Sequence, residues 1–178
     1  MKNNKISNGV NDKLERSLVL LKPDAINRGL IGEILHRFER TGLKLVGLKL
    51  VWSDEDTALK HYSEDLAKRR GQRVRDIMVE MITSGPIVAI AIEGVEAVEI
   101  VRKMVGATEP KSAAPGTIRG DYAHLSFKHA DDNQMAVFNL IHASSSVPEA
   151  KEEISYWFHD FELYSHQPDY TKHTLLEK

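Results

Sequence analysis

The sequence predicts a domain that mixes helices and strands, and three observations support this fold class. Short apolar runs of strand length alternate along the chain with segments whose apolar residues recur at helical spacing. The chain has 178 residues, a length that suits one domain of ordinary size. Apolar residues make up 42% of it and charged residues 28%, which is typical of a globular protein rather than a disordered one. Alternation alone fits either a doubly wound parallel sheet or a split β-α-β sheet with antiparallel strands.

The N-terminal third predicts a strand, a helix and a second strand. Residues 16–22 form a short apolar run followed by proline, as expected of a buried strand. Apolar residues recur at helical spacing over 30–38, and Gly42 stands where a left-handed residue would end that helix. Residues 43–52 alternate apolar and polar on either side of Val46-Gly47, which predicts a strand with a β-bulge.

The middle of the chain continues this alternation. Ser53 is the expected N-cap of a helix that runs to about Tyr62. Residues 72–82 are expected to form the next helix, 87–92 a strongly apolar central strand, and 95–105 another helix.

The C-terminal part predicts a loop, a strand and a terminal helix. Residues 106–116 are rich in Gly, Pro and Ala, which favours a loop. Residues 118–127 are interpreted as a strand and 128–134 as the polar turn after it. The run Ser146-Val147-Pro148-Glu149 has the pattern of a capping box with proline in the first turn, so a helix is expected to begin there.

The charge balance argues against a nucleic-acid partner. The 24 Lys and Arg residues and 26 Asp and Glu residues give a formal net charge of −2, so a broadly basic surface is not expected. The most basic stretch is 63–75. It can be interpreted either as a solvated loop and helix face or as a lip that faces an anion.

Cysteine is absent, which excludes disulfide scaffolds, cysteine zinc sites, iron–sulfur clusters and thiol nucleophiles. No stretch approaches the ~18 apolar residues that a membrane span requires, so no membrane partner is expected. Residues 1–13 are polar and lack the apolar block of a secretion signal. We expect a mobile tail over 1–13, a single domain over 14–178 and a cytoplasmic location.

One histidine stands in a context that suits chemistry. His142 lies just before the helix expected to begin at Ser146, and a helix N-terminus favours the neutral imidazole and nearby anions. Glu153 lies one or two turns into that helix, where a carboxylate could accept the second ring N–H and fix the tautomer. A structural histidine near a cap is the alternative. The other seven histidines lack zinc-type spacing, and no metal site on the protein is expected.

Phosphate binding needs cations with fixed geometry, and three candidates are spread along the chain. Lys22 ends the first strand, Arg102 lies on a helix and Arg119 follows a turn. Each could also be an ordinary surface or salt-bridge residue. Neither a Walker-type phosphate loop nor a dinucleotide fingerprint occurs, so a bound nucleotide would need another kind of site.

Five segments together resemble the nucleoside diphosphate kinase family, in that family's order. The resemblance covers about residues 14–164. The segments are Leu21-Lys22-Pro23-Asp24, Ser84-Gly85-Pro86, Gly106-Ala107-Thr108-Glu109-Pro110, Pro115-Gly116-Thr117-Ile118-Arg119-Gly120-Asp121 and Asn139-Leu140-Ile141-His142.

The resemblance implies an α+β fold, namely a ferredoxin-like β-α-β-β-α-β sandwich with an antiparallel four-stranded sheet and added helices. It implies transfer of the γ-phosphate of a nucleoside triphosphate to a nucleoside diphosphate, by a ping-pong mechanism through a phosphohistidine at His142. In the family pattern Glu153 orients that histidine with Ser144 as its hydroxyl partner, and Tyr62 lies near the reacting phosphate. The matched nucleotide-binding positions are Lys22, Val74, Arg102, Thr108, Arg119 and Asn139.

The resemblance also implies partners. Mg²⁺ would arrive on the nucleotide phosphates rather than in a protein cage. Family members are commonly hexamers or tetramers, so a homo-oligomer is expected. The chain departs from the family pattern after its histidine, where Ala143-Ser144-Ser145-Ser146 replaces Gly-Ser-Asp-Ser. Val74 stands where the family stacks an aromatic ring on the base, and the 63–83 and 122–138 regions are longer than the pattern.

Two alternative functions belong to other classes. One is a catalytically weak, nucleotide-binding regulatory protein on the same fold, and the presence of His142 argues against it. The other is a nucleic-acid-binding module, which the negative net charge disfavours.

Overall fold

A computed structural model describes residues 14–168 of the chain, and its described strands form one antiparallel sheet in the order β2-β3-β1-β4. The strands are β1 (Leu14–Leu21), β2 (Lys44–Val51), β3 (Ile87–Val95) and β4 (Ile141–Ala143). Helices connect β1 to β2 and β3 to β4, which gives the β-α-β-β-α-β order of a ferredoxin-like fold. The predicted α+β class is confirmed, and the parallel doubly wound alternative is excluded.

Helices fill the connections, and three of them are inserted between β2 and β3. The helices are α1 (Pro23–Asn27), α2 (Ile31–Arg40), α3 (Glu55–His61), α4 (Glu64–Arg70), α5 (Gln72–Thr83), α6 (Ala97–Val105), α7 (Ile118–Tyr122), α8 (Phe127–Asp132) and α9 (Val147–Trp157). Short 3₁₀ turns lie at Pro110–Ser112 and Asp160–Glu162. No helix in the described part of the chain is long and apolar enough to cross a bilayer.

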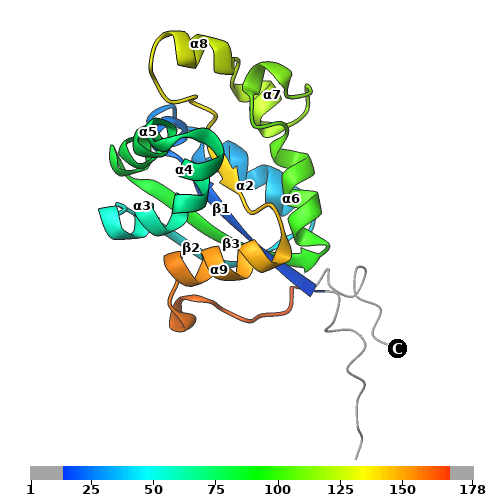
Figure 1. The fold of residues 1–178 in the computed structure, drawn as a ribbon. Coiled ribbons are helices and arrows are strands. Elements are labelled where there is room, and N and C mark those ends of the chain that lie inside the picture. Colours follow the sequence, from blue (N-terminus) through cyan, green and yellow to red (C-terminus); the bar gives the residue numbers. More distant parts are fainter. Residues whose placement is uncertain (1–13, 169–178) are drawn as a thin grey trace, which may run out of the picture.

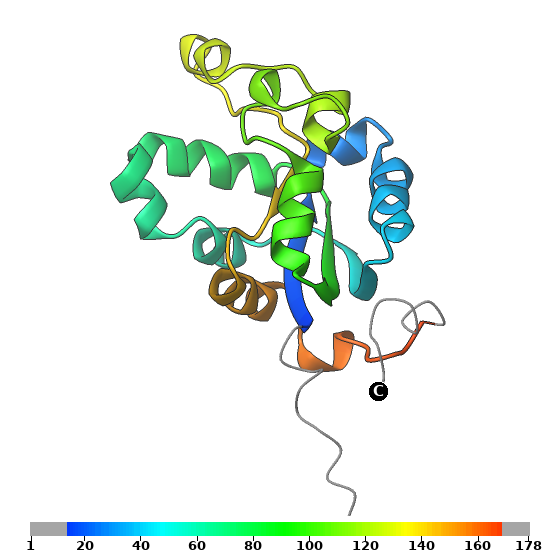
Figure 2. The same cartoon turned by 90° about the vertical axis from the view of Figure 1, so that its right-hand side faces the viewer.

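The sheet lies between two helical layers because successive side chains of a strand point to opposite faces. Leu21 and Ile90 pack with α2 and α6 on one face, whereas Leu20 and Ala89 pack with α3, α5 and α9 on the other. Figure 1 shows these layers, and Figure 2 shows α4 and α5 projecting from one side of the sheet, with the α7–α8 segment above its end. The two central strands, β1 and β3, are therefore the most deeply buried.

Two local features of the first half match the sequence pattern. The pairing of β2 with β3 shifts register between Leu45 and Gly47, so the predicted bulge is confirmed. Gly42 follows α2 with a φ of 77°, the left-handed conformation predicted for it. The helix predicted from Ser53 is also present, but its N-cap is Asp54, whose carboxylate accepts from the backbone of Thr57.

The strand predicted for 118–127 is wrong, as is the turn predicted for 128–134. Thr117 caps α7 by accepting from Gly120 N, and Ser126 caps α8 by accepting from His129 N. These local caps start helices where the apolar content indicated a strand. The fourth strand is instead β4, three residues long, which was not predicted.

Two predictions reach beyond the described residues. The tail predicted over 1–13 lies outside them, and the single domain predicted over 14–178 includes undescribed residues at its C-terminal end.

Candidate active site

His142 lies in β4 opposite Leu20 of β1, at the end of a turn that is held by two hydrogen bonds. Leu140 begins the turn with a φ of 69°, a left-handed conformation that costs a non-glycine residue energy. Its N–H donates to Asp24 Oδ2 at 3.0 Å, and its carbonyl accepts from Lys22 N at 2.8 Å. The segment after β1 therefore fixes the strained turn that carries His142.

Helix α9 is separated from β4 by three residues and carries Glu153. Ser146 caps it by accepting from Glu149 N, as predicted. The reciprocal bond of a capping box is not made, because the Glu149 carboxylate accepts from Ser145 N instead, at 2.7 Å. Glu149 thus tethers the position at which the family pattern has an aspartate.

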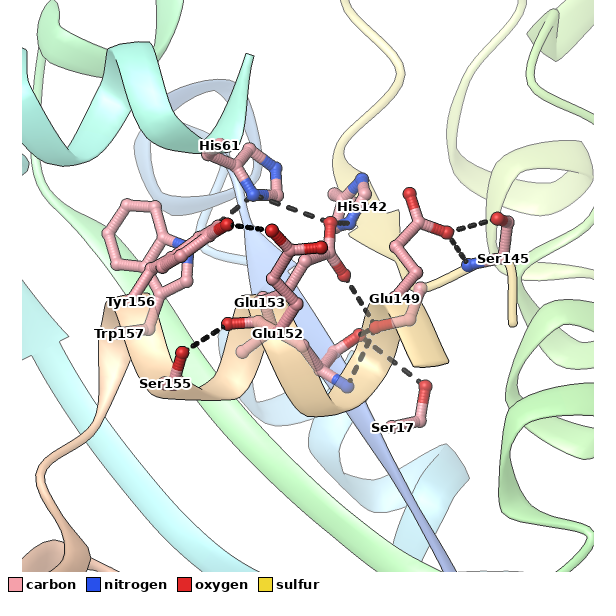
Figure 3. A network of polar contacts seen from close by, with 12 residues as sticks. Ser17, His61, His142, Ser145, Glu149, Glu152, Glu153, Ser155, Tyr156 and Trp157 are labelled. Atoms are coloured by element: carbon pink, nitrogen blue, oxygen red, sulfur yellow. Dashed lines mark hydrogen bonds and ion pairs between the residues drawn. The ribbon is translucent and has the colours of Figure 1, made fainter. Parts of the chain in front are cut away.

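The Glu153 carboxylate contacts Ser144 through one oxygen and His142 through the other. Figure 3 shows Glu153 on α9 with His142 nearby. Ser144 Oγ donates to Glu153 Oε2 at 2.6 Å and accepts from Leu18 N at 3.1 Å. Glu153 Oε1 lies 2.7 Å from His142 Nε2, a close contact whose angles are not those of a hydrogen bond. Nε2 therefore faces the carboxylate, and Nδ1 is the nitrogen that remains for attack.

The surroundings of His142 keep its imidazole neutral. Burial lowers the pKa of His142 to about 3, and the charges of Lys22, Arg119 and Arg102 act in the same direction. Burial raises the pKa of Glu153, opposed by His61 and by the Ser144 hydrogen bond. A neutral imidazole keeps the lone pair that a nucleophile needs. Burial and nearby cations thus keep His142 neutral, an effect that the sequence predicted from the helix N-terminus.

Lys22 starts a chain of polar contacts that reaches the loop after α6. Its Nζ donates to Asn139 Oδ1 at 2.8 Å, and Asn139 Nδ2 donates to the Thr108 carbonyl at 2.9 Å. Lys22 is 3% exposed, and burial and the charge of Arg119 lower its pKa to about 8 against the opposing effect of Asp24. The site thus holds a largely buried amino group whose pKa lies close to neutral pH.

Arg119 is buried, and its guanidinium organises the backbone around the site. It donates to the carbonyls of Gly106 at 3.0 Å, Asn139 at 3.2 Å and Ile141 at 2.5 Å. Gly106 has a φ of 85°, and a Cβ there would lie 2.5 Å from Thr117 Oγ1. Burial and the charge of Arg102 lower the pKa of Arg119 to about 10, so the two guanidinium groups share one electrostatic environment.

A cavity of about 400 Å³ opens between α3–α5, the α8 loop and β4. Six predicted site residues line it, namely Tyr62, Val74, Thr108, Asn139, His142 and Glu153. Lys22, Arg102, Arg119 and Ser144 are not in this lining. The apolar residues of the lining form what we call the apolar wall, and the charged Asp65, Arg69, Arg70 and Asp131 also line the cavity. The members of the apolar wall are Leu66, Val74, Ile77, Met78, Phe127, Ala130, Met135, Ala136 and Val137.

A family model described as nucleoside diphosphate kinase matches residues 15–163. The chain belongs to the nucleoside diphosphate kinase family. The predicted fold and enzyme class, a nucleoside-diphosphate kinase, are therefore confirmed.

Curated relatives in the nucleoside diphosphate kinase family cover most of the chain. One from Borreliella burgdorferi is 43% identical over 157 residues, which are 88% of this chain and 94% of the relative. One from Pyrococcus furiosus is 48% identical over 155 residues, 87% of this chain and 89% of the relative. A solved structure of the Borrelia burgdorferi kinase, described as a transition state mimic with bound vanadate and ADP, has a TM-score of 0.89. That structure is 41% identical and covers 92% of this chain and 98% of its own.

The sequence pattern did not single out two residues of this candidate site. Asp24 was quoted only as part of a motif, yet it holds the Leu140 turn. His61 was set aside with the other histidines, yet it lies against His142. In the described residues, four buried side-chain atoms have no hydrogen-bond partner, and all belong to this region: Asp24 Oδ1, His61 Nε2, Tyr62 Oη and His142 Nε2. Unpaired buried polar atoms are costly, so their clustering indicates a site built for a polar ligand.

Proposed function

We propose that this chain transfers the γ-phosphate of a nucleoside triphosphate, usually ATP, to a nucleoside diphosphate by a ping-pong mechanism through a phosphohistidine at His142. The observation that supports it best is the neutral His142 imidazole with Nε2 turned to Glu153. Incubation with ATP labelled at the γ-phosphate and unlabelled GDP tests the proposal. Labelled GTP is the expected product, and its absence would contradict the proposal.

In the proposed first half-reaction, the His142 Nδ1 lone pair attacks the γ-phosphorus. The bond from phosphorus to the β,γ-bridging oxygen breaks, and its electron pair leaves on the diphosphate. In the second half-reaction, a terminal oxygen of another nucleoside diphosphate attacks the phosphohistidine, and Nδ1 recovers its lone pair. Glu153 stabilises the positive charge that develops on the ring, because its Oε1 lies 2.7 Å from Nε2.

Phosphoryl transfer depends on positioning and on neutralising charge. Lys22, Arg102 and Arg119 all affect the electrostatics of His142, and we propose that they converge on one phosphate chain. Burial raises the pKa of Tyr62 above its usual value, so its unpartnered hydroxyl stays protonated and can donate to a phosphate oxygen.

Mg²⁺ is proposed as part of the nucleotide substrate. The charges of Lys22, Arg102 and Arg119 all act on His142, and a cationic site of this kind suits a nucleotide that carries its own metal on phosphate oxygens and water. Asn139 and Thr108 lie at the edge of the cavity and are proposed to contact the sugar and phosphates.

The apolar wall is proposed to hold the nucleobase. Val74 lies in this wall, and Phe127 supplies an aromatic ring from α8. The guanidinium of Arg70 lies over the Phe127 ring at 5.4 Å, and Arg73 donates to Gln134 at 2.6 Å, so α4 and α5 contact the α8 segment at two points. Phe127 thus offers the aromatic surface that Val74 lacks.

Phe127→Ala is expected to raise the KM for nucleoside diphosphates by about tenfold with little change in kcat, because base–aromatic stacking contributes ~1–3 kcal/mol. Steady-state kinetics with several diphosphates measures the change. Phe127→Tyr is the matched control and should stay near the wild-type KM, because it keeps the ring. An unchanged KM in the alanine variant would place the base elsewhere.

Glu153→Gln is expected to lower kcat by about 10- to 100-fold, because the amide keeps the shape but loses the charge that stabilises the developing imidazolium. The dissociation constant for ADP, measured by calorimetry, should change little, since Glu153 faces the histidine. A large loss of ADP affinity with unchanged turnover would count against an orienting role.

A homo-oligomer is proposed from the exposed edge strand β2. Leu48 and Leu50 of β2 are 51% and 64% exposed, and Trp52 directly after the strand is 63% exposed, which is more apolar surface than an edge strand usually leaves to water. Both a hexamer and a tetramer remain compatible with this surface. The proposed location is the cytoplasm, which fits a chain without cysteine.

A further inference from the structure

His61 is a buried histidine that the proposed reaction does not use. It is the last residue of α3, and its side chain is only 1% exposed. Its ring meets the His142 ring edge to face, with the ring centroids 4.4 Å apart and the planes at 84°. Figure 3 shows His61 above α9, with Trp157 on one side of it and His142 on the other.

The Nδ1 side of the His61 ring is held by helix α9. Trp157 Nε1 donates to His61 Nδ1 at 3.5 Å, and an indole N–H can only donate. Glu153 Oε1 lies 3.4 Å from the same Nδ1, so this side of the ring contacts both residues of α9, and Nε2 is a buried atom without a hydrogen-bond partner. Trp157 follows Glu153 by one helical turn on α9, so the same helix face holds both His61 and the carboxylate.

His61 is also neutral. Burial lowers the pKa of His61 well below its usual value, with His142 and Lys22 acting in the same direction and Glu153 opposing. A neutral, immobile ring can restrict rotation of the His142 ring without adding a charge to it. Rotation matters because only one orientation turns Nε2 to Glu153 and leaves Nδ1 for the phosphate.

His61 could instead be a metal ligand together with His142 and Glu153. Ligand atoms of His61, His142 and Glu153 all lie within 4.8 Å of one another. The positive charges of Lys22 and Arg119, which lower the pKa of His142, would oppose a dication in the same way.

We propose that His61 is a positioning residue: its ring edge, held by Trp157 Nε1–H, keeps the His142 ring oriented with Nε2 towards Glu153. The inference rests on the proposed function, because an oriented ring matters only if Nδ1 receives a phosphoryl group. It predicts an effect on transfer and on the His142 tautomer, without an effect on nucleotide binding.

The test compares His61→Leu, which fills the space without a planar edge, with His61→Phe, which restores the ring. Phosphorylation of the full chain by ATP is followed in single turnovers, ADP affinity by calorimetry, and the His142 tautomer by ¹⁵N NMR.

His61→Leu is expected to slow phosphorylation at least about tenfold, because small misplacements of reacting groups cost ~10²-fold in rate. ADP affinity should stay within about twofold, and the His142 spectrum should show more proton on Nδ1. His61→Phe should recover most of the rate, and the exposed-site control His36→Ala should match wild type.

Three results would overturn the inference: an unchanged rate in His61→Leu, a slow rate matched by an equal loss of ADP affinity, or a Phe variant as slow as the Leu variant. Trp157→Phe extends the test if the Leu variant does not fold, because it removes the N–H that fixes His61 and leaves His61 in place. It should shift the His142 spectrum in the same direction, and an unchanged spectrum would count against the inference. A wild-type protein without transfer would instead contradict the proposed function itself.

Discussion

His142→Ala is expected to remove phosphoryl transfer almost completely, with a loss of at least about a thousandfold in kcat, because the substitution removes the Nδ1 that the proposed mechanism uses as its nucleophile. ADP should still bind, because Lys22, Arg102 and Arg119 remain. Quantified transfer from ATP to GDP and calorimetric titration with ADP measure the two properties separately.

The control for this substitution is His36→Ala, which removes an exposed histidine on α2, far along the chain from β4. It should keep wild-type transfer. If His142→Ala kept more than a few per cent of the wild-type rate, the phosphoryl group would have to pass through another residue or directly between nucleotides.

Lys22→Met is expected to lower kcat/KM by at least about a hundredfold, because methionine keeps the length of the buried side chain but removes a charge that we propose acts on the phosphates. Lys22 also donates to Asn139, so both the charge and the position of the amide depend on it. Thermal melts should accompany the kinetics, since a folded variant with unchanged kcat/KM would contradict the role of Lys22.

The same lysine predicts the pH dependence of the free enzyme. With the pKa of Lys22 lowered to about 8, its ammonium is present below that pH and lost as the pH rises through it. A plot of kcat/KM against pH should therefore fall above about pH 8, since this parameter reports groups of the free enzyme. Lys22→Met should lack this alkaline fall at its lower rate, whereas a fall that persisted would belong to another group.

Much of the fold follows from local patterns, and the errors arise where distant contacts decide. The bulge of β2 and the left-handed Gly42 are encoded by periodicity and by glycine itself. Strand β4 is only three residues long and exists because it pairs with β1, a contact that no local pattern reports. The segment 118–127 has strand-like apolar content, but caps at Thr117 and Ser126 make it helical.

Some residues of the candidate site can be predicted from sequence spacing, whereas others come together only through tertiary packing. His142, Glu153 and Ser144 lie within 12 positions of one another in sequence order, and their contact follows from the start of α9. His61 could not be found by spacing, because its partner Trp157 is 96 residues away and reaches it only through the packing of α3 against α9. The burial of Arg119, with three carbonyl partners, is likewise a tertiary property.

The most direct test of the account is the site of the phosphoryl group on the intermediate. The protein is phosphorylated with ATP, kept at alkaline pH where phosphohistidine survives, and examined by ³¹P and ¹⁵N NMR and by peptide mapping. Because Nε2 faces Glu153 at 2.7 Å, the phosphate is expected on Nδ1 of His142, and added GDP should discharge it. A phosphate on Nε2, on another residue, or one that GDP does not remove would contradict the account.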